Sequence, residues 1–294
     1  MSWMLLSILA SVFLSASNII DKYIYTKLLR KPIISLIMMA IIGIITSIPI
    51  YYIKGFSELS YALILAAFLS SAVYLIAVFL YFKAVKIEEI SRIVPLFYIT
   101  PLFVLILAAL FLGERFTGLK YLGILLLVAG AMLISVKRPF RLSFGKAFWL
   151  VMASSFGISI NSVVIKYLLG FADFWTVYSY MRIGAFVWLI PFYFINFKDI
   201  REAVRKHKAK AIGLASLSEF LNLAAVFLIV IASSVGYVTL IGALVSVQPF
   251  FVLLFAALLS IYVPRVLKEE ISRSTIALKI IAIIVMFTGA MLIG

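Results

Sequence analysis

Apolar stretches of about twenty residues recur along almost the whole chain, and they leave few folds open. We count ten, at about 3–21, 33–53, 59–82, 90–112, 117–136, 147–169, 172–196, 211–232, 234–262 and 274–293. A helix needs about 20 residues to cross the hydrocarbon core of a bilayer. A transmembrane β-strand alternates apolar and polar side chains over about ten residues, which these stretches do not do. The pattern predicts an all-α, polytopic membrane bundle of ten transmembrane helices, because helices satisfy their own backbone groups in lipid.

The composition supports a membrane protein and excludes several site chemistries. Hydrophobic residues make up 66% of the chain and charged residues 13%, whereas soluble domains are about 45–50% apolar and about 25% charged. No cysteine occurs, which excludes disulfides, thiolate metal sites and a cysteine nucleophile. We expect no metal and no other cofactor. The first apolar stretch lacks the basic segment of a secretory signal, so we expect it to be retained as the first helix.

One apolar stretch occurs twice. The segment Thr100–Phe111 (TPLFVLILAALF) matches Gln248–Leu259 (QPFFVLLFAALL) at seven of twelve positions and an offset of 148 residues. Shorter matches follow the same order in both halves of the chain: Ala77–Leu80 with Ala225–Leu228, Gly130–Ile134 with Gly289–Ile293, and Lys22-Tyr23 with Lys166-Tyr167. We therefore predict a first repeat at 1–137, a basic linker at 138–146 and a second repeat at 147–294.

An odd number of helices in each repeat fixes their relative direction. After five spans the chain is on the side of the bilayer opposite to its start, so the second repeat must begin there. The prediction is two inverted five-helix repeats (5+5), an arrangement found in secondary transporters. Pores and enzymes also use inverted repeats, so this feature favours transport without requiring it.

The basic residues predict the orientation of the chain. Its net charge is +15, and 20 of the 26 Lys and Arg residues lie in the odd-numbered connections, against four in the even-numbered ones. By the positive-inside rule, the odd-numbered loops are cytoplasmic and both termini lie outside. The charge therefore reflects topology, and we do not expect nucleic-acid binding. We expect a multi-pass protein of the cell membrane.

The first repeat resembles a known family. Pro101–Leu105 leads through Leu112-Gly113-Glu114-Arg115 into Tyr121–Gly130, which is similar to the EamA-domain signature of the drug/metabolite transporter superfamily. The second repeat keeps Gln248-Pro249 but has no Gly-Glu-Arg turn, and its longer loop holds Glu269-Glu270 instead.

The resemblance implies more than the residues alone. It implies ten helices, with helices 1, 3, 4, 6, 8 and 9 around a central cavity and helices 5 and 10 at the periphery. It also implies solute transport, often export of amino acids or other small metabolites, without ATP hydrolysis. Nothing in the chain resembles a phosphate-binding Walker loop.

Glu219 is the only carboxylate well inside a predicted span, about 12 Å deep at about 1.5 Å per residue. Ionisable groups in hydrocarbon usually face a bundle interior or a watery cavity. Glu219 is therefore a candidate for substrate contact or proton coupling, or else a structural partner of Arg182. For Arg182 we favour the structural role, because the resemblance places its helix outside the cavity. Asn222 shares the face of Glu219, and Ser71 and Tyr74 hold the matching positions in the first repeat.

Other polar side chains in the apolar stretches have two interpretations. Asn18 and Asn161 fit either a solute site or interhelical hydrogen bonds worth about 0.6–2 kcal/mol each. Both copies of the repeated helix also begin with polar residues beside a proline, which we expect to act as a cavity-lining hinge or a static kink. These residues are Tyr98, Thr100 and Pro101 in the first repeat and Ser246, Gln248 and Pro249 in the second.

Three functions remain open. We favour a secondary or facilitative transporter of a small metabolite, such as an amino-acid exporter, that works by alternating access at a midplane cavity between the repeats. The alternative is a lipid or lipid-linked sugar flippase of the same fold. A membrane enzyme or a structural subunit is least favoured, because no His-Glu-x-x-His or Gly-x-Ser-x-Gly motif occurs. The expected partners are a small solute and the bilayer, and a monomer suffices, although a dimer stays open.

Overall fold

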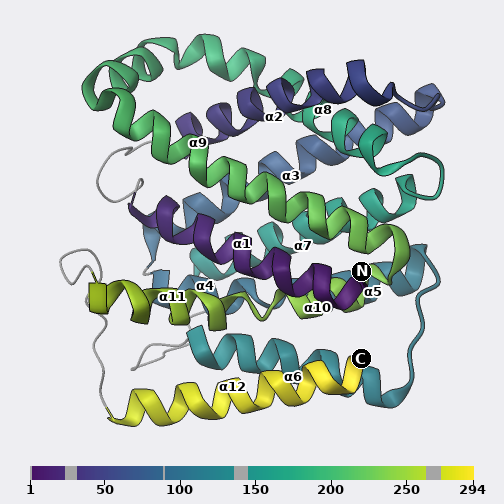
Figure 1. Ribbon diagram of the computed structural model, residues 1–294, viewed down its shortest axis with the longest axis vertical. Helices are drawn as coiled ribbons and strands as arrows, with labels where there is room; N and C mark the ends of the chain where they lie inside the picture. Colours follow the sequence, from purple (N-terminus) through teal and green to yellow (C-terminus); the bar gives the residue numbers. More distant parts are fainter. Residues whose placement is uncertain (1, 24–31, 89, 136–144, 263–272) are drawn as a thin grey trace.

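The computed structural model describes residues 2–23, 32–88, 90–135, 145–262 and 273–294. Short connections join long helices that run in roughly the same direction across the view in Figure 1. In chain order, the helices are α1 (Trp3–Tyr23), α2 (Pro32–Lys54), α3 (Tyr61–Ile87), α4 (Ile90–Phe97), α5 (Thr100–Phe111), α6 (Gly118–Ser135), α7 (Lys146–Leu168), α8 (Phe174–Ile195), α9 (Phe197–Val235), α10 (Val238–Val245), α11 (Gln248–Tyr262) and α12 (Arg273–Ile293). The predicted all-α bundle is confirmed.

The membrane character of the bundle is also clear from its helices. Among the described residues, seven helical segments are long and apolar enough to cross a membrane. The structure divides the predicted spans at 90–112 and 234–262 into shorter helices, so the described part of the chain holds twelve helices. A multi-pass bundle is therefore confirmed, while the count of ten spans stays a prediction.

The two divided spans break in the same way. In the first, the Leu102 N–H donates to the carbonyl of Ile99 at 2.9 Å, and in the second the Phe250 N–H donates to the carbonyl of Val247 at 2.9 Å. These are i to i+3 bonds, which tighten the chain between two helices. The bonds are related by the 148-residue offset of the repeated sequence.

The breaks show where the two prolines lie, while their role as a hinge or a static kink stays a prediction. Pro101 and Pro249 stand at the second residue of α5 and α11, not in the interior of a bent helix. The first turn of a helix tolerates proline, because its N–H groups have no intrahelical partner. The axis therefore changes at the residues before each proline, and the proline begins the next helix.

Helices α6 and α12 lie side by side at one end of the bundle, the lower end in Figure 1. Their contact depends on glycines. A Cβ atom on Gly130 would come within 2.3 Å of Met286 Cγ, and one on Gly289 within 2.7 Å of the carbonyl oxygen of Gly123. These glycines permit the close approach of the two helices, and the peripheral position that the resemblance implied for α6 and α12 is borne out.

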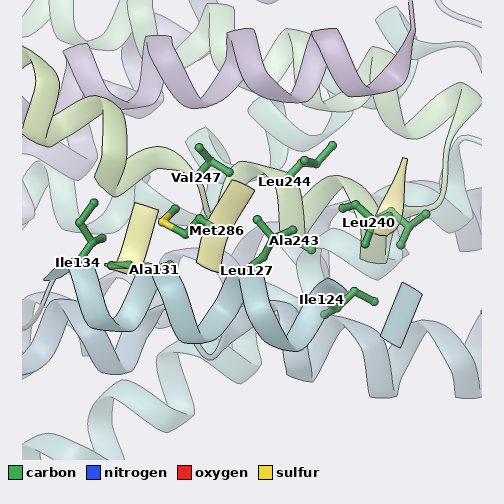
Figure 2. Packing of buried hydrophobic residues seen from close by; sticks show 11 residues of the cluster. Ile124, Leu127, Ala131, Ile134, Leu240, Ala243, Leu244, Val247 and Met286 are labelled. Carbon is green, nitrogen blue, oxygen red and sulfur yellow. The ribbon is translucent and has the colours of Figure 1, made fainter. Parts of the chain in front are cut away.

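A cluster of buried apolar side chains joins this helix pair to the broken helix of the second repeat (Figure 2). Burying a Leu or Ile side chain stabilises a fold in water by about 1.5–3 kcal/mol, but lipid reduces this term and leaves close packing as the main contribution. The members are Ile124, Leu127, Ala131 and Ile134 of α6, Leu240, Ala243 and Leu244 of α10, Val247, and Ala282, Met286 and Ile293 of α12.

The hydrophilic stretch Lys198–Lys210, which lies between the predicted spans at 172–196 and 211–232, is helical. It forms the first part of the 39-residue helix α9. The stretch has no Gly or Pro and is rich in Lys, Arg, Glu and Ala, which are good helix formers. Most of the predicted linker at 138–146 and the pair Glu269-Glu270 lie outside the described residues.

Candidate functional site

A cavity of about 90 Å³ lies among helices α2, α3, α7, α8 and α9, so both predicted repeats contribute to it. One water needs about 10–15 Å³ of such space, so the cavity has room for several waters or for a small group of a solute. Most of its wall is apolar. The lining residues are Leu36, Ala40, Ser71, Tyr74, Leu75, Asn161, Ile165, Val177, Tyr178, Met181, Arg182, Ala185, Val226 and Val230.

Arg182 is the charged residue of the cavity wall. It is 9% exposed, and its guanidinium lies over the ring of Tyr178, 5.2 Å from the ring centroid. Its stem packs against α2, where a Cβ atom on Gly43 would come within 3.0 Å of Arg182 Cδ. No described residue forms a hydrogen bond or an ion pair with this guanidinium. A cation–π contact alone supplies less stabilisation than a carboxylate partner would.

Tyr74 lies between two opposite charges. Its hydroxyl is close enough to both Arg182 and Glu219 to feel each of them electrostatically. Glu219 is 9% exposed, and the Asn222 amide donates to its Oε2 at a long 3.5 Å. Of the predicted group, Ser71 and Tyr74 lie on the cavity wall, Glu219 acts electrostatically on Tyr74, and Asn222 contacts Glu219.

Asn161 of α7 also reaches the cavity wall. The Ser70 hydroxyl of α3 donates to its Oδ1 at 3.0 Å, which leaves the amide N–H groups as donors. At the positions related by the repeat, Ser17 of α1 and Ser218 of α9 share a hydrogen bond of 2.9 Å. The two contacts join corresponding helices of the two predicted repeats, but only the one at Asn161 borders the cavity.

A second pair of repeat-related contacts crosses between the halves. The Ser15 hydroxyl of α1 lies 3.0 Å from the main-chain oxygen of Gln248 and shares its donor with the carbonyl of Ser11 at 2.6 Å. The Ser159 hydroxyl of α7 lies 3.1 Å from the main-chain oxygen of Thr100 and shares its donor with the carbonyl of Ser155 at 2.7 Å. Each half thus binds the first residue of the other half's repeated helix, which ties α5 and α11 to the centre of the bundle.

The remaining predicted site residues lie off the cavity wall. Asn18 is exposed on α1, and Tyr98 packs beside the apolar cluster of α6, α10 and α12. The hydroxyls of Thr100 and Ser246 donate to carbonyls of their own turns, at 2.6 and 3.1 Å. The side chain of Gln248 is half-buried and does not line the cavity. The structure therefore gathers Ser71, Tyr74 and Asn161 on the cavity wall. The other predicted residues lie near the helix breaks or on the outside of the bundle.

Comparison with known proteins identifies the first half of the chain. Residues 1–136 match the EamA-like transporter family. The match agrees with the drug/metabolite transporter superfamily that the turn at 112–115 resembles.

Two further comparisons concern sequence and fold. A curated protein of Sinorhizobium sp., named an uncharacterized transporter in the cobO 3' region, is 38% identical over 56 residues, which are 19% of this chain and 40% of that protein. The match thus spans less than half of the relative. A solved structure, described only as "Crystal structure of protein", superposes with a TM-score of 0.70 over 99% of this chain and 95% of that chain at 16% identity. That likeness shows a shared fold.

The EamA-like turn after α5 binds the second half of the chain. Gly113 adopts a φ of +69°, a left-handed conformation that ends a helix and that glycine accepts without strain. The Glu114 side chain that follows is buried, and its two oxygens accept the N–H groups of Val238 and Thr239 at 2.8 and 3.2 Å. A carboxylate from the first half therefore caps the positive end of α10.

Lys166 of α7 completes this junction. Its Nζ donates to the main-chain oxygen of Gly236 at 2.7 Å and to that of Ser233, at the carbonyl end of α9. Lys166 also interacts electrostatically with Glu114. A cation at the end of α9 and an anion at the start of α10 thus fix the connection between the two helices.

The cavity differs from the ring of helices that the resemblance implied. Helix α8, the seventh predicted span, was expected outside, yet it supplies Tyr178, Met181, Arg182 and Ala185. The cost of a charge in hydrocarbon was the signal that could have placed Arg182 at a cavity. The partners of Glu114 could not have been found this way, because they are backbone groups more than 120 residues away.

Proposed function

We propose that this chain is a membrane transporter of the drug/metabolite type, and that its solute binds in the cavity among α2, α3, α7, α8 and α9. The match of residues 1–136 to the EamA-like transporter family supports transport, as does a relative named an uncharacterized transporter. Transport would be secondary or facilitative. The solute would be a small metabolite, with amino-acid efflux as one form.

The observation that carries this proposal is a cavity with a buried charge on α8, the seventh predicted span. Arg182 is 91% shielded from solvent in an otherwise largely apolar wall. Isolated charges are rare in hydrocarbon because of their desolvation cost, and they mark solute or ion pathways when they occur. Ser71, Tyr74 and Asn161 add polar groups on the same wall, which suits a solute that is partly polar.

Alternating access would use the two matching helix breaks. The breaks precede Thr100 and Gln248, whose carbonyls receive serine hydroxyls from the opposite half. Pro101 and Pro249 keep these joints free of a continuous helical hydrogen-bond ladder. We propose that the two inverted halves, 1–137 and 147–294, rock about these joints and expose the cavity to each side in turn.

Glu219 is the proposed proton-coupling group. Its charge acts on Tyr74, which lines the cavity, so a change in its protonation alters the field in the cavity. In proteoliposomes with an imposed proton gradient, Glu219→Gln is expected to abolish gradient-driven accumulation while exchange of solute continues. Undiminished accumulation by this variant would show that Glu219 has no coupling role.

The proposed setting is the cell membrane, with the odd-numbered loops in the cytoplasm and both termini outside. Tags at each terminus that react with an impermeant reagent on intact cells test this orientation. Both halves of one chain line the cavity, so we propose that a monomer suffices for transport.

Filling the cavity tests the proposed site. Ala40 is 4% exposed and lines the cavity, whereas Ala153 on α7 faces outward. A metabolite panel is screened by thermal shift, and the flux of a hit is measured in proteoliposomes. Ala40→Phe is expected to reduce flux at least tenfold, and Ala153→Phe to leave it unchanged. Equal flux in both variants would place the pathway elsewhere.

A lipid or lipid-linked sugar flippase remains the second candidate, because apolar residues such as Leu36, Val226 and Val230 form most of the cavity wall. Labelled lipids and water-soluble solutes are compared in the same vesicles. Lipid translocation that Ala40→Phe abolishes, without flux of any water-soluble solute, would favour the flippase.

A further inference from the structure

Arg182 lines the cavity, and its guanidinium contacts the ring of Tyr178 rather than a carboxylate. It is nine-tenths buried, it lines the cavity, and no described residue gives it a hydrogen bond or an ion pair. A buried cation is strongly stabilised when an anion with hydrogen-bond acceptors occupies the adjacent space. We propose that Arg182 binds the carboxylate of the transported solute, and that this solute is a compact monocarboxylate with an apolar body. The inference rests on the proposed function, since it uses the same cavity.

The surroundings of Arg182 hold it ready for such a ligand. Gly43 leaves room for its stem on α2, and Tyr178 supports its guanidinium from α8. Tyr178 is itself anchored, because its hydroxyl shares a 3.3 Å hydrogen bond with Thr46 of α2. A guanidinium fixed in this way presents a planar fork of donors that matches the two oxygens of a carboxylate.

The other groups of the wall narrow the class of anion. Glu219 acts electrostatically on Tyr74 beside Arg182, so a second negative charge on the solute would meet repulsion. A phosphate dianion or a dicarboxylate would therefore bind less well, because Arg182 would neutralise only one of its two negative charges. Apolar lining residues such as Leu75, Ile165 and Val177 favour a hydrocarbon body, and a cavity of about 90 Å³ limits its size.

Three probes of one shape test this inference on the purified full chain. They are 4-methylpentanoate, 4-methylpentanamide and 4-methylpentylamine, and calorimetry measures their binding. The wild type is expected to bind the acid about tenfold or more tightly than the amide, because hydrogen bonds to charged groups are the stronger ones. The amine is expected to bind no better than the amide.

Variants assign the preference to Arg182. Arg182→Gln is expected to bind acid and amide equally, and Arg182→Lys to keep part of the preference because it keeps the charge. Arg115→Gln removes a charge from an exposed loop position and is expected to leave the preference intact. If Arg182→Gln does not fold, Gly43→Ala, which displaces the arginine stem, is expected to reduce the preference several-fold.

Three results would overturn the inference: no binding of the acid to the wild type, equal binding of acid and amide, or a preference that survives in Arg182→Gln. The proposed function fails separately. If Ala40→Phe blocks the flux of a neutral solute and the acid shows no advantage, the cavity is the transport site and only the role of Arg182 is refuted. If Ala40→Phe affects no solute, the cavity itself is refuted.

Discussion

Removing the carboxylate of Glu114 would release the N-terminus of α10. In the structure its two oxygens accept the N–H groups of Val238 and Thr239, and the side chain is 4% exposed. Glu114→Ala leaves both donors without this acceptor in a buried place. A buried donor without a partner costs about 1–3 kcal/mol, and loss of a helix cap about 0.5–2 kcal/mol. The two costs describe the same lost hydrogen bonds and are not simply added, so we expect a destabilisation of about 2–4 kcal/mol.

Glu114→Gln separates shape from charge. The amide keeps one oxygen as acceptor but turns an NH₂ group toward the other backbone N–H, and it no longer opposes the charge of Lys166. We expect about half the effect of the alanine variant. Thermal unfolding of the purified protein in one detergent gives the comparison, and about 2–4 kcal/mol corresponds to a lower Tm by roughly 5 °C or more.

Glu58 offers a matched control for these variants. It is an exposed carboxylate in the connection between α2 and α3, so Glu58→Ala changes the net charge by the same amount without removing a cap. Its Tm is expected to stay within about 1 °C of the wild type, since surface substitutions rarely exceed about 0.5 kcal/mol. A wild-type Tm in Glu114→Ala, or an equal loss in Glu58→Ala, would refute the reasoning about the junction.

Two further predictions concern packing and pH. Gly130→Ala places a Cβ atom 2.3 Å from Met286 Cγ and is expected to cost about 1–3 kcal/mol, whereas Gly118→Ala, which meets no atom within 4 Å, is expected to cost nothing. A wild-type Tm in Gly130→Ala would show that α6 and α12 can separate freely. Burial raises the pKa of Asp173, the residue before α8, but hydrogen bonds from Ser57, Thr176 and Trp175 outweigh this and lower the pKa overall. The contribution of Asp173 to the free energy of unfolding is fully present above the ordinary Asp pKa of about 3.9. This contribution is lost as the pH falls through the lowered pKa of the folded protein. A fall in Tm across that acid range should shrink in Asp173→Asn, and an identical profile would contradict this.

The sequence was sufficient to predict the helical class and the repeated element. Thr100 and Gln248 begin α5 and α11, as the alignment of the two stretches implies, and Gly130 and Gly289 mark the α6–α12 contact. These features depend on local properties: apolar length, proline at a first turn and glycine at a close approach. They are readable because each is decided within one or two turns of helix.

Other features depend on tertiary contacts. A continuous apolar run such as 90–112 does not reveal a break, because both of its parts are equally apolar. The stretch Lys198–Lys210 has a composition that suits a loop as well as a solvated helix, and helix propensity together with continuity into α9 decided between them. Hydropathy alone does not distinguish these alternatives.

The candidate site was predictable in part for the same reason. Ser71, Tyr74 and Asn161 were recognisable as polar residues in apolar spans, and the cavity gathers them. Which of several such residues share a cavity depends on helix rotation and tilt. For Arg182, the helix arrangement implied by the family resemblance predicted a position outside the cavity. The cost of burying its charge predicted the observed position on the cavity wall better.

Accessibility of a single cysteine tests the central claim, that the cavity is a solute site open to each side in turn. The chain has no cysteine, so Ala185→Cys on the cavity wall and Ala153→Cys on the outer face of α7 react without background. We predict that an impermeant thiol reagent modifies Cys at position 185 from either side of the membrane, that a transported solute protects it, and that position 153 responds to neither. Modification at position 185 from one side only, without protection by any transported solute, would contradict alternating access at this cavity.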